Sequence, residues 1–341
     1  MIIAGVGART PLGLTSTQTG FLGRAGMVSL QEAPLPDGEG RPFTMGLVSV
    51  VPRELRGTER VEALTGPALE ELFSELGQRL AGARLRLHLL ADEPMGAFSV
   101  DTASLELALR RQARALHGTD AAVEIHAAGT GGGAAVLTTI QQRLEQGACD
   151  AVLFGGAHTD ADPSRIEALT ASDRIFSPDN RDGIIPGEGA AFVLLTLPAT
   201  ARALGLPVRA VIQAFSAGFE AARPDNDHPA FEAKGLTLAV RRALNEANAQ
   251  AGWLMSDLSS ELFRLHEYQA VSARSQDLLC APQVMEAPAQ RIGDQGAASL
   301  PLHLALAVEA WRRGYAPFPR LLTTTGSDSG ARTAVVVAQP T

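Results

Sequence analysis

The sequence predicts an α/β fold built from a duplicated unit, and three observations support this prediction. The chain has 341 residues, more than one average domain, and 45% of them are hydrophobic, which is enough to fill a large core. Strand-like and helix-like patterns alternate along the chain. Each half ends in a glycine-rich turn followed by an apolar strand, at 187–196 and at 326–338. We therefore expect two α/β halves, 1–200 and 201–341.

In the first half, apolar runs bounded by turn residues predict strands, and apolar residues three and four apart predict amphipathic helices. The expected strands are 1–5, 84–90, 122–127, 150–155 and 190–196. The expected helices are 69–80, 102–115 and 134–146, with 164–170 either a helix or a loop, and 31–60 a loop excursion. The opening strand is expected at the edge of a layer. The strand–helix–strand order predicts a parallel sheet with right-handed crossovers.

The second half follows a connector at 198–207 and repeats the same theme. The expected strands are 208–215 and 333–338, the expected helices are 236–248 and 296–311, and 262–272 is either a strand or a helix. No short tandem repeat is visible, so a duplicated α/β unit is the simplest architecture.

Composition and charge exclude several classes of function. The net charge of −8 disfavours binding to nucleic acid or to an anionic membrane. The start of the chain lacks the pattern of a signal peptide, and the apolar stretches fall short of the roughly 20 residues that span a bilayer. Cys149 and Cys280 cannot form a disulfide framework. We expect a soluble cytoplasmic protein, and Lys234, as the only lysine, leaves little room for lysine chemistry.

The strand–glycine–helix segment at 126–133 is the most informative motif. A sharp turn from strand to helix exposes one side chain and presents backbone N–H groups to whatever binds there. Thr130 offers the only side-chain nucleophile in this segment, and a threonine needs a base to activate it. The more common role of such glycines is to allow close packing. A P-loop is excluded, because no Gly-Lys-Ser/Thr follows.

Other polar clusters give weaker signals. His158, Asp160 and Asp162 could ligate a metal, but a solvated loop after a strand end is the more common origin of such a cluster. Residues 179–188 resemble half of a calcium-binding loop, with the glutamate too early in the spacing. Residues 326–330 imitate a serine elbow but carry aspartate at the position of the nucleophile. The sequence therefore predicts neither a metal nor a cofactor.

The histidines of the second half and the two cysteines are weak candidates for catalysis. His303 lies in an apolar stretch and is expected to be a core residue. His266, followed by Glu267, is compatible with an ion-pair network or with a base. Cys149 and Cys280 have no basic neighbour in the sequence that would lower a thiol pKa, so we expect both to be inert.

Four segments also resemble those of a known family. They are 2–13, 147–157, 176–190 and 292–298, and the third is the most specific, with its Arg-Asp-Gly and Gly-Glu-Gly-Ala runs. These segments are similar to those of the thiolase-like superfamily, and within it of the β-ketoacyl-acyl-carrier-protein synthases. The resemblance spans most of the chain. It implies a duplicated thiolase fold of five layers, αβαβα, which is usually dimeric, with a shortened C-terminal half.

The positions that match the family's active site carry other residues. The family's cysteine falls on Thr130 or the adjacent Gly129, and its second histidine falls on Asp294. His266 is the nearest candidate for the first histidine, and the lysine has no counterpart after Lys234. Condensation requires a thiolate and two imidazole donors that stabilise negative charge. The resemblance therefore implies a chain that has lost the condensing machinery.

Three hypotheses for function follow from the resemblance. The first is a pseudoenzyme that acts as an adaptor or chaperone for a protein partner. Segments 261–267 and 293–301 resemble a small bacterial thiolase-like group associated with type VI secretion, which implies a secretion effector as the partner. The second is a subunit similar to a chain length factor that pairs with a synthase paralogue. The third is an acyltransferase that uses Thr130 with His266. In each case the resemblance implies a homodimer or another protein complex.

Overall fold

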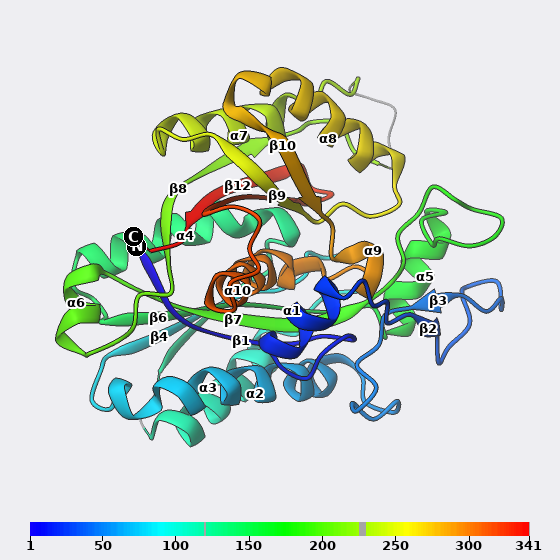
Figure 1. Ribbon diagram of the computed structural model, residues 1–341. Helices are drawn as coiled ribbons and strands as arrows, with labels where there is room; N and C mark the ends of the chain where they lie inside the picture. The colour runs from blue at the N-terminus through cyan, green and yellow to red at the C-terminus, as the bar shows by residue number, and fades with distance from the viewer. Residues whose placement is uncertain (119–120, 225–229, 341) are drawn as a thin grey trace.

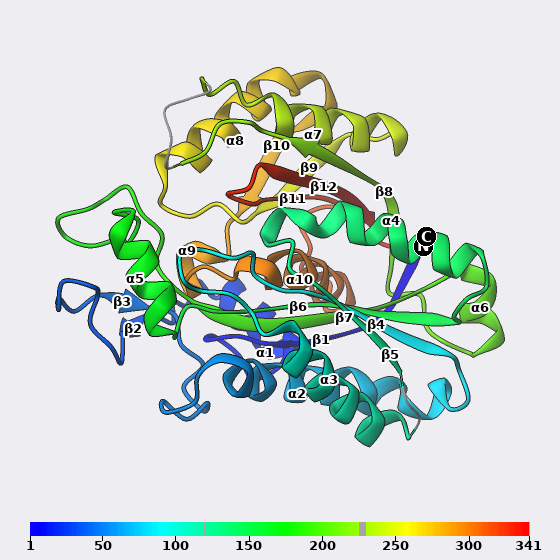
Figure 2. The same cartoon turned by 180° about the vertical axis from the view of Figure 1, so that it is seen from behind.

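Helices and strands form five layers in the computed structural model, which describes residues 1–118, 121–224 and 230–340. Two sheets enclose a central layer of helices, and further helices cover the outer face of each sheet (Figures 1 and 2). The duplicated αβαβα architecture expected from the sequence is therefore confirmed.

The first sheet has the strand order β5-β4-β6-β7-β1. Its strands are β1 (Ile2–Arg9), β4 (Leu85–Leu90), β5 (Ala122–His126), β6 (Ala151–Thr159) and β7 (Glu188–Thr196). On its outer face lie α2 (Gly57–Leu76) and α3 (Thr102–His117). A core of aliphatic side chains fills the space between these two helices and the sheet.

The second sheet repeats this order as β10-β9-β11-β12-β8. Its strands are β8 (Ala210–Phe219), β9 (Ala251–Ser256), β10 (Leu279–Glu286), β11 (Arg320–Gly326) and β12 (Ala331–Ala338). In both sheets the first three strands are parallel, and the next two alternate in direction. The halves thus share strand order and strand direction, which is the mark of a duplication. The division of the chain near residue 200 stays a prediction.

The central layer consists of α4 (Gly133–Glu145) and α10 (Ser299–Arg312), between the two sheets (Figure 2). Both helices contact strands of both halves, and they share one apolar core with them. Helices α7 (Lys234–Glu246) and α8 (Leu262–Arg274) cover the outer face of the second sheet. The shorter elements are α1 (Ser16–Arg24), β2 (Gln31–Glu32), β3 (Thr44–Met45), α5 (Pro163–Ala171), α6 (Pro198–Ala203) and α9 (Ala289–Ile292).

Three expectations about these elements were wrong. β1 does not lie at the edge of a layer, because it pairs with β7 on one side and with β8 on the other, so that one continuous sheet has ten strands. The sheet is mixed rather than parallel, since β6 and β7 are antiparallel. Helix α2 begins at Gly57 rather than near residue 69, and Pro67 lies inside it. The apolar face of α2 is buried against β1, and this packing outweighs the helix-breaking tendency of proline.

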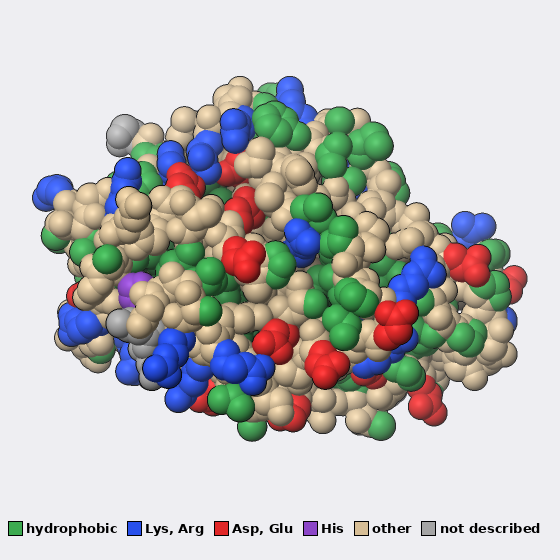
Figure 3. Space-filling model, turned by 90° about the horizontal axis from the view of Figure 1, so that it is seen from below, with side chains coloured by type: hydrophobic (Ala, Val, Ile, Leu, Met, Phe, Trp, Pro, Cys, Tyr) green, Lys and Arg blue, Asp and Glu red, His purple; other side chains and the backbone are tan. Residues whose placement is uncertain are grey.

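Among the described residues, no helix has the length and apolar character needed to cross a bilayer. On the face that carries α2 and α3, acidic and basic side chains are interspersed (Figure 3).

A buried ion pair attaches α2 to β7. The side chains of Arg60 and Glu188 are 1% and 0% exposed, and two hydrogen bonds of 2.6 and 2.8 Å join them. Glu188 also accepts hydrogen bonds from the backbone N–H of Val48 and from the Thr159 hydroxyl. The Gly-Glu-Gly motif therefore provides a structural anchor in this chain.

We predict that Glu188→Gln lowers the free energy of unfolding by about 3–5 kcal/mol, because it leaves the Arg60 guanidinium buried without a counter-charge. The matched control is Glu106→Gln, which removes the exposed ion pair with Arg110 and should cost no more than about 1 kcal/mol. Urea denaturation of both variants measures the difference. Equal losses would contradict the anchoring role of Glu188.

Candidate functional site

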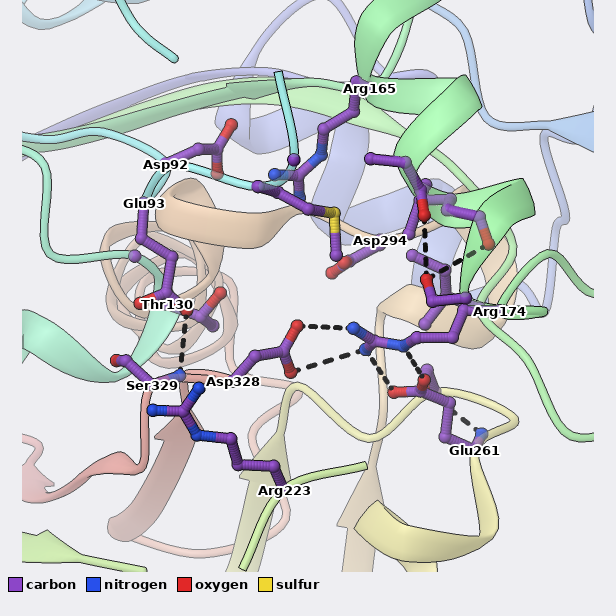
Figure 4. A pocket seen from close by; sticks show the side chains of 18 of the residues that line it. Asp92, Glu93, Thr130, Arg165, Arg174, Arg223, Glu261, Asp294, Asp328 and Ser329 are labelled. Atoms are coloured by element: carbon purple, nitrogen blue, oxygen red, sulfur yellow. Dashed lines mark hydrogen bonds and ion pairs between the residues drawn. The ribbon is translucent and has the colours of Figure 1, made fainter. Parts of the chain in front are cut away.

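A cavity of about 460 Å³ opens where strands of both halves end (Figure 4). The segments after β4, β5 and β9 and the turn between β11 and β12 contribute to its wall, together with α5. Ligands of open α/β sheets bind at the carboxyl ends of parallel strands, and this cavity has that position. It is therefore the candidate functional site.

Gly129, one of the two positions onto which the family's nucleophile falls, has a backbone conformation that disfavours a side chain. Its φ of 60° and ψ of −163° lie in a region that is essentially restricted to glycine. A Cβ atom at this position would lie 2.7 Å from the Ser327 hydroxyl oxygen. That hydroxyl accepts a hydrogen bond from the N–H of Gly131 at 2.7 Å and donates to the carbonyl of Ala128 at 3.1 Å. Ser327 thus holds the turn from a strand of the other half.

The rest of the glycine run serves close packing, as expected. A Cβ atom at Gly131 would lie 2.1 Å from the carbonyl oxygen of Ala331, and one at Gly133 would lie 2.3 Å from the side chain of Leu300. The start of α4 is therefore pressed against β12 and α10.

Three of the four predicted site positions meet at this cavity. Gly129, Thr130 and Asp294 line it, whereas His266 is exposed on α8 and does not. None of the hydrogen bonds between described residues involves the Thr130 hydroxyl. The structure therefore does not bring Thr130 and His266 together as a nucleophile and its base. One oxygen of Asp294 accepts a hydrogen bond from the N–H of Gly296 at 3.0 Å.

Charged side chains dominate the cavity wall. The six acidic residues are Asp92, Glu93, Asp257, Glu261, Asp294 and Asp328, and the four arginines are Arg165, Arg174, Arg223 and Arg264. Most of these groups belong to two ionic clusters, which occupy opposite sides of the cavity in Figure 4.

The first cluster is centred on Arg174 and joins the two halves. Arg174 follows α5, and its guanidinium donates to Glu261 at 2.7 and 3.1 Å and to Asp328 at 2.6 and 3.4 Å. Arg264 on α8 donates to the same aspartate at 3.0 Å. Burial alone would raise the pKa of Asp328, but the two guanidinium groups outweigh it and hold that pKa well below its usual range. Asp328 is therefore ionised at neutral pH.

The second cluster is centred on His158 at the end of β6. Its imidazole lies 2.8 Å from Asp92 and 3.0 Å from Asp160, and Arg165 donates to Asp160 at 2.8 Å. Burial alone would lower the pKa of His158, but Asp160 and Asp92 outweigh it and raise that pKa well above its ordinary value. The interpretation of this motif as a solvated loop was wrong, because both His158 and Asp160 are fully buried. Asp162, by contrast, caps α5.

Neither histidine–carboxylate group fits a metal ion well. His158, Asp160 and Asp294 place possible ligand atoms within 4.8 Å of one another, but the Arg165 guanidinium lies 2.8 Å from Asp160, and its positive charge opposes a cation there. A second such group, His88, Glu124 and His126, lies at the sheet edge formed by β4 and β5. There Arg86 and Arg143 each lie 2.8 Å from Glu124, and their positive charges oppose a cation.

The remaining candidates lie outside the cavity. His303 is buried, accepts or donates a 2.8 Å hydrogen bond with Thr323, and has its pKa lowered to about 3 by burial, as expected of a core residue. Burial raises the pKa of the Cys149 thiol, and Cys280 is likewise a free cysteine.

The sequence did not reveal most of the charged residues that line this site. Arg174 and Asp257 belong to no motif, Glu261 appeared only in the segment 261–267, and Asp328 only in the turn that imitates a serine elbow. Some of the partners are distant in the sequence, 154 residues apart for Arg174 and Asp328 and 66 for His158 and Asp92. The local signals were the His158–Asp160 motif and a charged residue inside a glycine-rich turn.

Asp257 is a titratable group of the cavity whose ionisation changes the stability of the fold. Burial raises its pKa to about 6, and the charge of Asp294 adds to this, while Arg264 and a hydrogen bond from Gly326 act in the opposite direction. Because the folded-state pKa lies above the unfolded value, protonated Asp257 stabilises the fold at low pH, and this contribution is lost as the pH rises through about 6.

We predict that Asp257→Asn becomes more stable relative to the wild type between about pH 4 and about pH 7.5, because asparagine stays neutral over this range. Denaturation curves of both proteins at the two pH values give the difference in free energy of unfolding. If the difference in free energy of unfolding between the two proteins stays constant or shrinks with rising pH, ionisation of Asp257 does not destabilise the fold, and the prediction is wrong.

Comparison with known proteins agrees with this architecture. A family model described as the β-ketoacyl synthase N-terminal domain matches residues 112–201. A search of curated proteins gives no match.

Three solved structures resemble the whole chain. The oxazolomycin ketosynthase domain OzmH KS7 of Streptomyces albus JA3453 has a TM-score of 0.77 at 15% identity, covering 100% of this chain and 74% of that one. The AntDE:AntF complex, a type II polyketide ketosynthase with its acyl-carrier protein, has a TM-score of 0.79 at 14% identity. The match covers 100% of this chain and 99% of that one. The ishigamide ketosynthase/chain length factor gives 0.74 at 19% identity, with the same coverage of both chains. The chain has the ketosynthase fold, a member of the thiolase-like folds.

Proposed function

We propose that this protein is a ketosynthase-fold protein that has lost condensing activity and acts by binding another protein. The observation that carries the proposal is the strand-to-helix turn. The family's nucleophile falls on Thr130 or the adjacent Gly129. A Cβ atom at Gly129 would lie 2.7 Å from the Ser327 hydroxyl oxygen, and among the described residues no base forms a hydrogen bond with the Thr130 hydroxyl. Covalent acyl transfer requires an activated nucleophile at this turn.

The charges around the turn support the same proposal. Decarboxylative condensation builds negative charge, which active sites stabilise with hydrogen-bond donors or cations. Asp257 and Asp294 line the cavity on this side, and among the described residues neither forms an ion pair with an arginine. Their negative charge would oppose such a transition state.

In the role we favour, this protein is the adaptor or chaperone, and its partner is another protein. The sequence resemblance suggests a type VI secretion effector as that partner. A chain-length-factor-like role is the second candidate. It is favoured by the structural likeness to a ketosynthase/chain length factor and to a ketosynthase that was solved with its carrier protein. In either case β5 is available for assembly, since it is an edge strand of the sheet and edge strands readily pair with another chain. A homodimer is the simplest assembly of this kind.

We predict that Gly129→Cys does not restore acyl transfer. The substitution forces a non-glycine residue into a glycine-only conformation, which costs about 1–3 kcal/mol, and it places Cβ against Ser327. The matched control, Thr130→Cys, changes a neighbouring side chain that the cavity already accommodates and should leave the melting temperature nearly unchanged. Intact-protein mass spectrometry after incubation with acyl-CoA should show no adduct on the wild type or on Gly129→Cys.

An acyl adduct on Thr130 in the wild type would overturn the proposal. Affinity purification from the native host distinguishes the two partner classes: a secretion effector supports the adaptor, and a cysteine-bearing synthase supports the chain-length-factor role. If affinity purification recovers the protein without any partner, with and without prior crosslinking of the lysate, both the adaptor role and the chain-length-factor role are contradicted.

A further inference from the structure

A second cavity of about 460 Å³ lies on another side of the molecule, between α1 of the first half and the inner face of β9 and β10. It shares no lining residue with the charged cavity. Helices α9 and α10 contribute the rest of its wall. Its volume falls within the range of sites for small molecules, about 300–1,000 Å³.

The floor of this cavity is apolar apart from the indole N–H of Trp253. Trp253, which is 1% exposed, lines the floor together with Val284, Leu306 and Ala310. Its Nε1–H makes no hydrogen bond of good geometry among the described residues, but it interacts with the carboxyl group of Glu286, which also lines the cavity. The cavity therefore offers apolar side chains to a ligand along most of its floor.

The rim of the cavity carries a surplus of positive charge. Arg24 on α1 donates to the carbonyl of Tyr315 at 3.4 Å, and Arg291 on α9 donates to the carbonyl of Gly23. Within the described residues neither arginine forms an ion pair at contact distance, but both interact electrostatically with Glu286, so that two guanidinium groups stand against one carboxyl group. Glu286 is the only acidic residue among the lining residues; partial burial raises its pKa, whereas Trp253, Arg291 and Arg24 act in the opposite direction.

We propose that this cavity binds an amphipathic anion, an aliphatic carboxylate of medium length. The apolar chain lies against Trp253, Leu306 and Ala310, and the carboxylate accepts hydrogen bonds from Arg24 and Arg291 at the rim. Charge complementarity selects the headgroup, because two guanidinium groups face a single carboxyl group. The proposal does not depend on the function of the charged cavity.

The two tryptophans of the chain provide the readout. Trp253 lines the cavity, and Trp311 packs edge-on against it with ring centroids 5.6 Å apart. Titration with decanoate should therefore change the tryptophan emission with saturation. Decyltrimethylammonium, which has the same chain with a cationic headgroup, should bind at least about tenfold more weakly.

Variants at the rim and in the cavity test the assignment. Arg24→Gln and Arg291→Gln should each weaken decanoate binding about tenfold through loss of a charge-assisted hydrogen bond. The matched control is Arg242→Gln, an exposed arginine on α7 outside the cavity, which should leave binding unchanged. Gly23→Leu should abolish binding by filling the cavity. It should fold normally, because an added Cβ would meet nothing closer than Leu12 at 3.9 Å.

Three results would overturn the proposal. The first is no saturable change in emission of the wild type with decanoate. The second is binding to a Gly23→Leu variant with an unchanged circular dichroism spectrum and melting temperature. The third is equal affinity for decanoate and decyltrimethylammonium, which would show that the rim arginines do not select the headgroup.

Discussion

The shape of the charged cavity depends on the ion pairs that Arg174 forms across the two halves. The planar guanidinium of Arg174 spans two carboxylates at once, Glu261 at the start of α8 and Asp328 in the turn between β11 and β12. A lysine could not make these parallel contacts, because its ammonium is a single point charge. The ion pairs fix segments of the second half above the strand-to-helix turn of the first half. The shape of the cavity is thus set by charge pairing between the halves.

This arrangement is stable because the central charge of each cluster has two partners of opposite charge, Glu261 and Asp328 for Arg174, and Asp92 and Asp160 for His158. Arg264 supports Asp328, and the His158 cluster balances its own two carboxylates with the imidazolium and Arg165. Removing a single member of such a network leaves an uncompensated charge in the interior, which is far more costly than replacing the whole network by apolar residues. A cavity of this kind cannot become apolar through one substitution.

Much of the fold was predictable from the sequence, because periodicity and turn residues report on local structure. The strands at 150–155 and 190–196 are apolar throughout and are buried on both faces as β6 and β7. The errors arose where distant contacts decide. The position of β1 depends on pairing with Val211 in the other half, and the early start of α2 depends on packing that overrides Pro67. Similarly, His158 was visible in the sequence, but its burial depends on Asp92, 66 residues away.

Because β8 lies in the middle of the ten-stranded sheet, the two halves could follow each other in the opposite order along the chain. Val211 pairs with Ile2 on one side and with Ala338 on the other, so the two ends of the described chain flank the same strand, as Figure 1 also shows. A short linker could therefore join these ends, and the chain could be opened instead in the exposed connector around α6. Such a circular permutation exchanges the order of the repeats and keeps every strand pairing of the sheet intact.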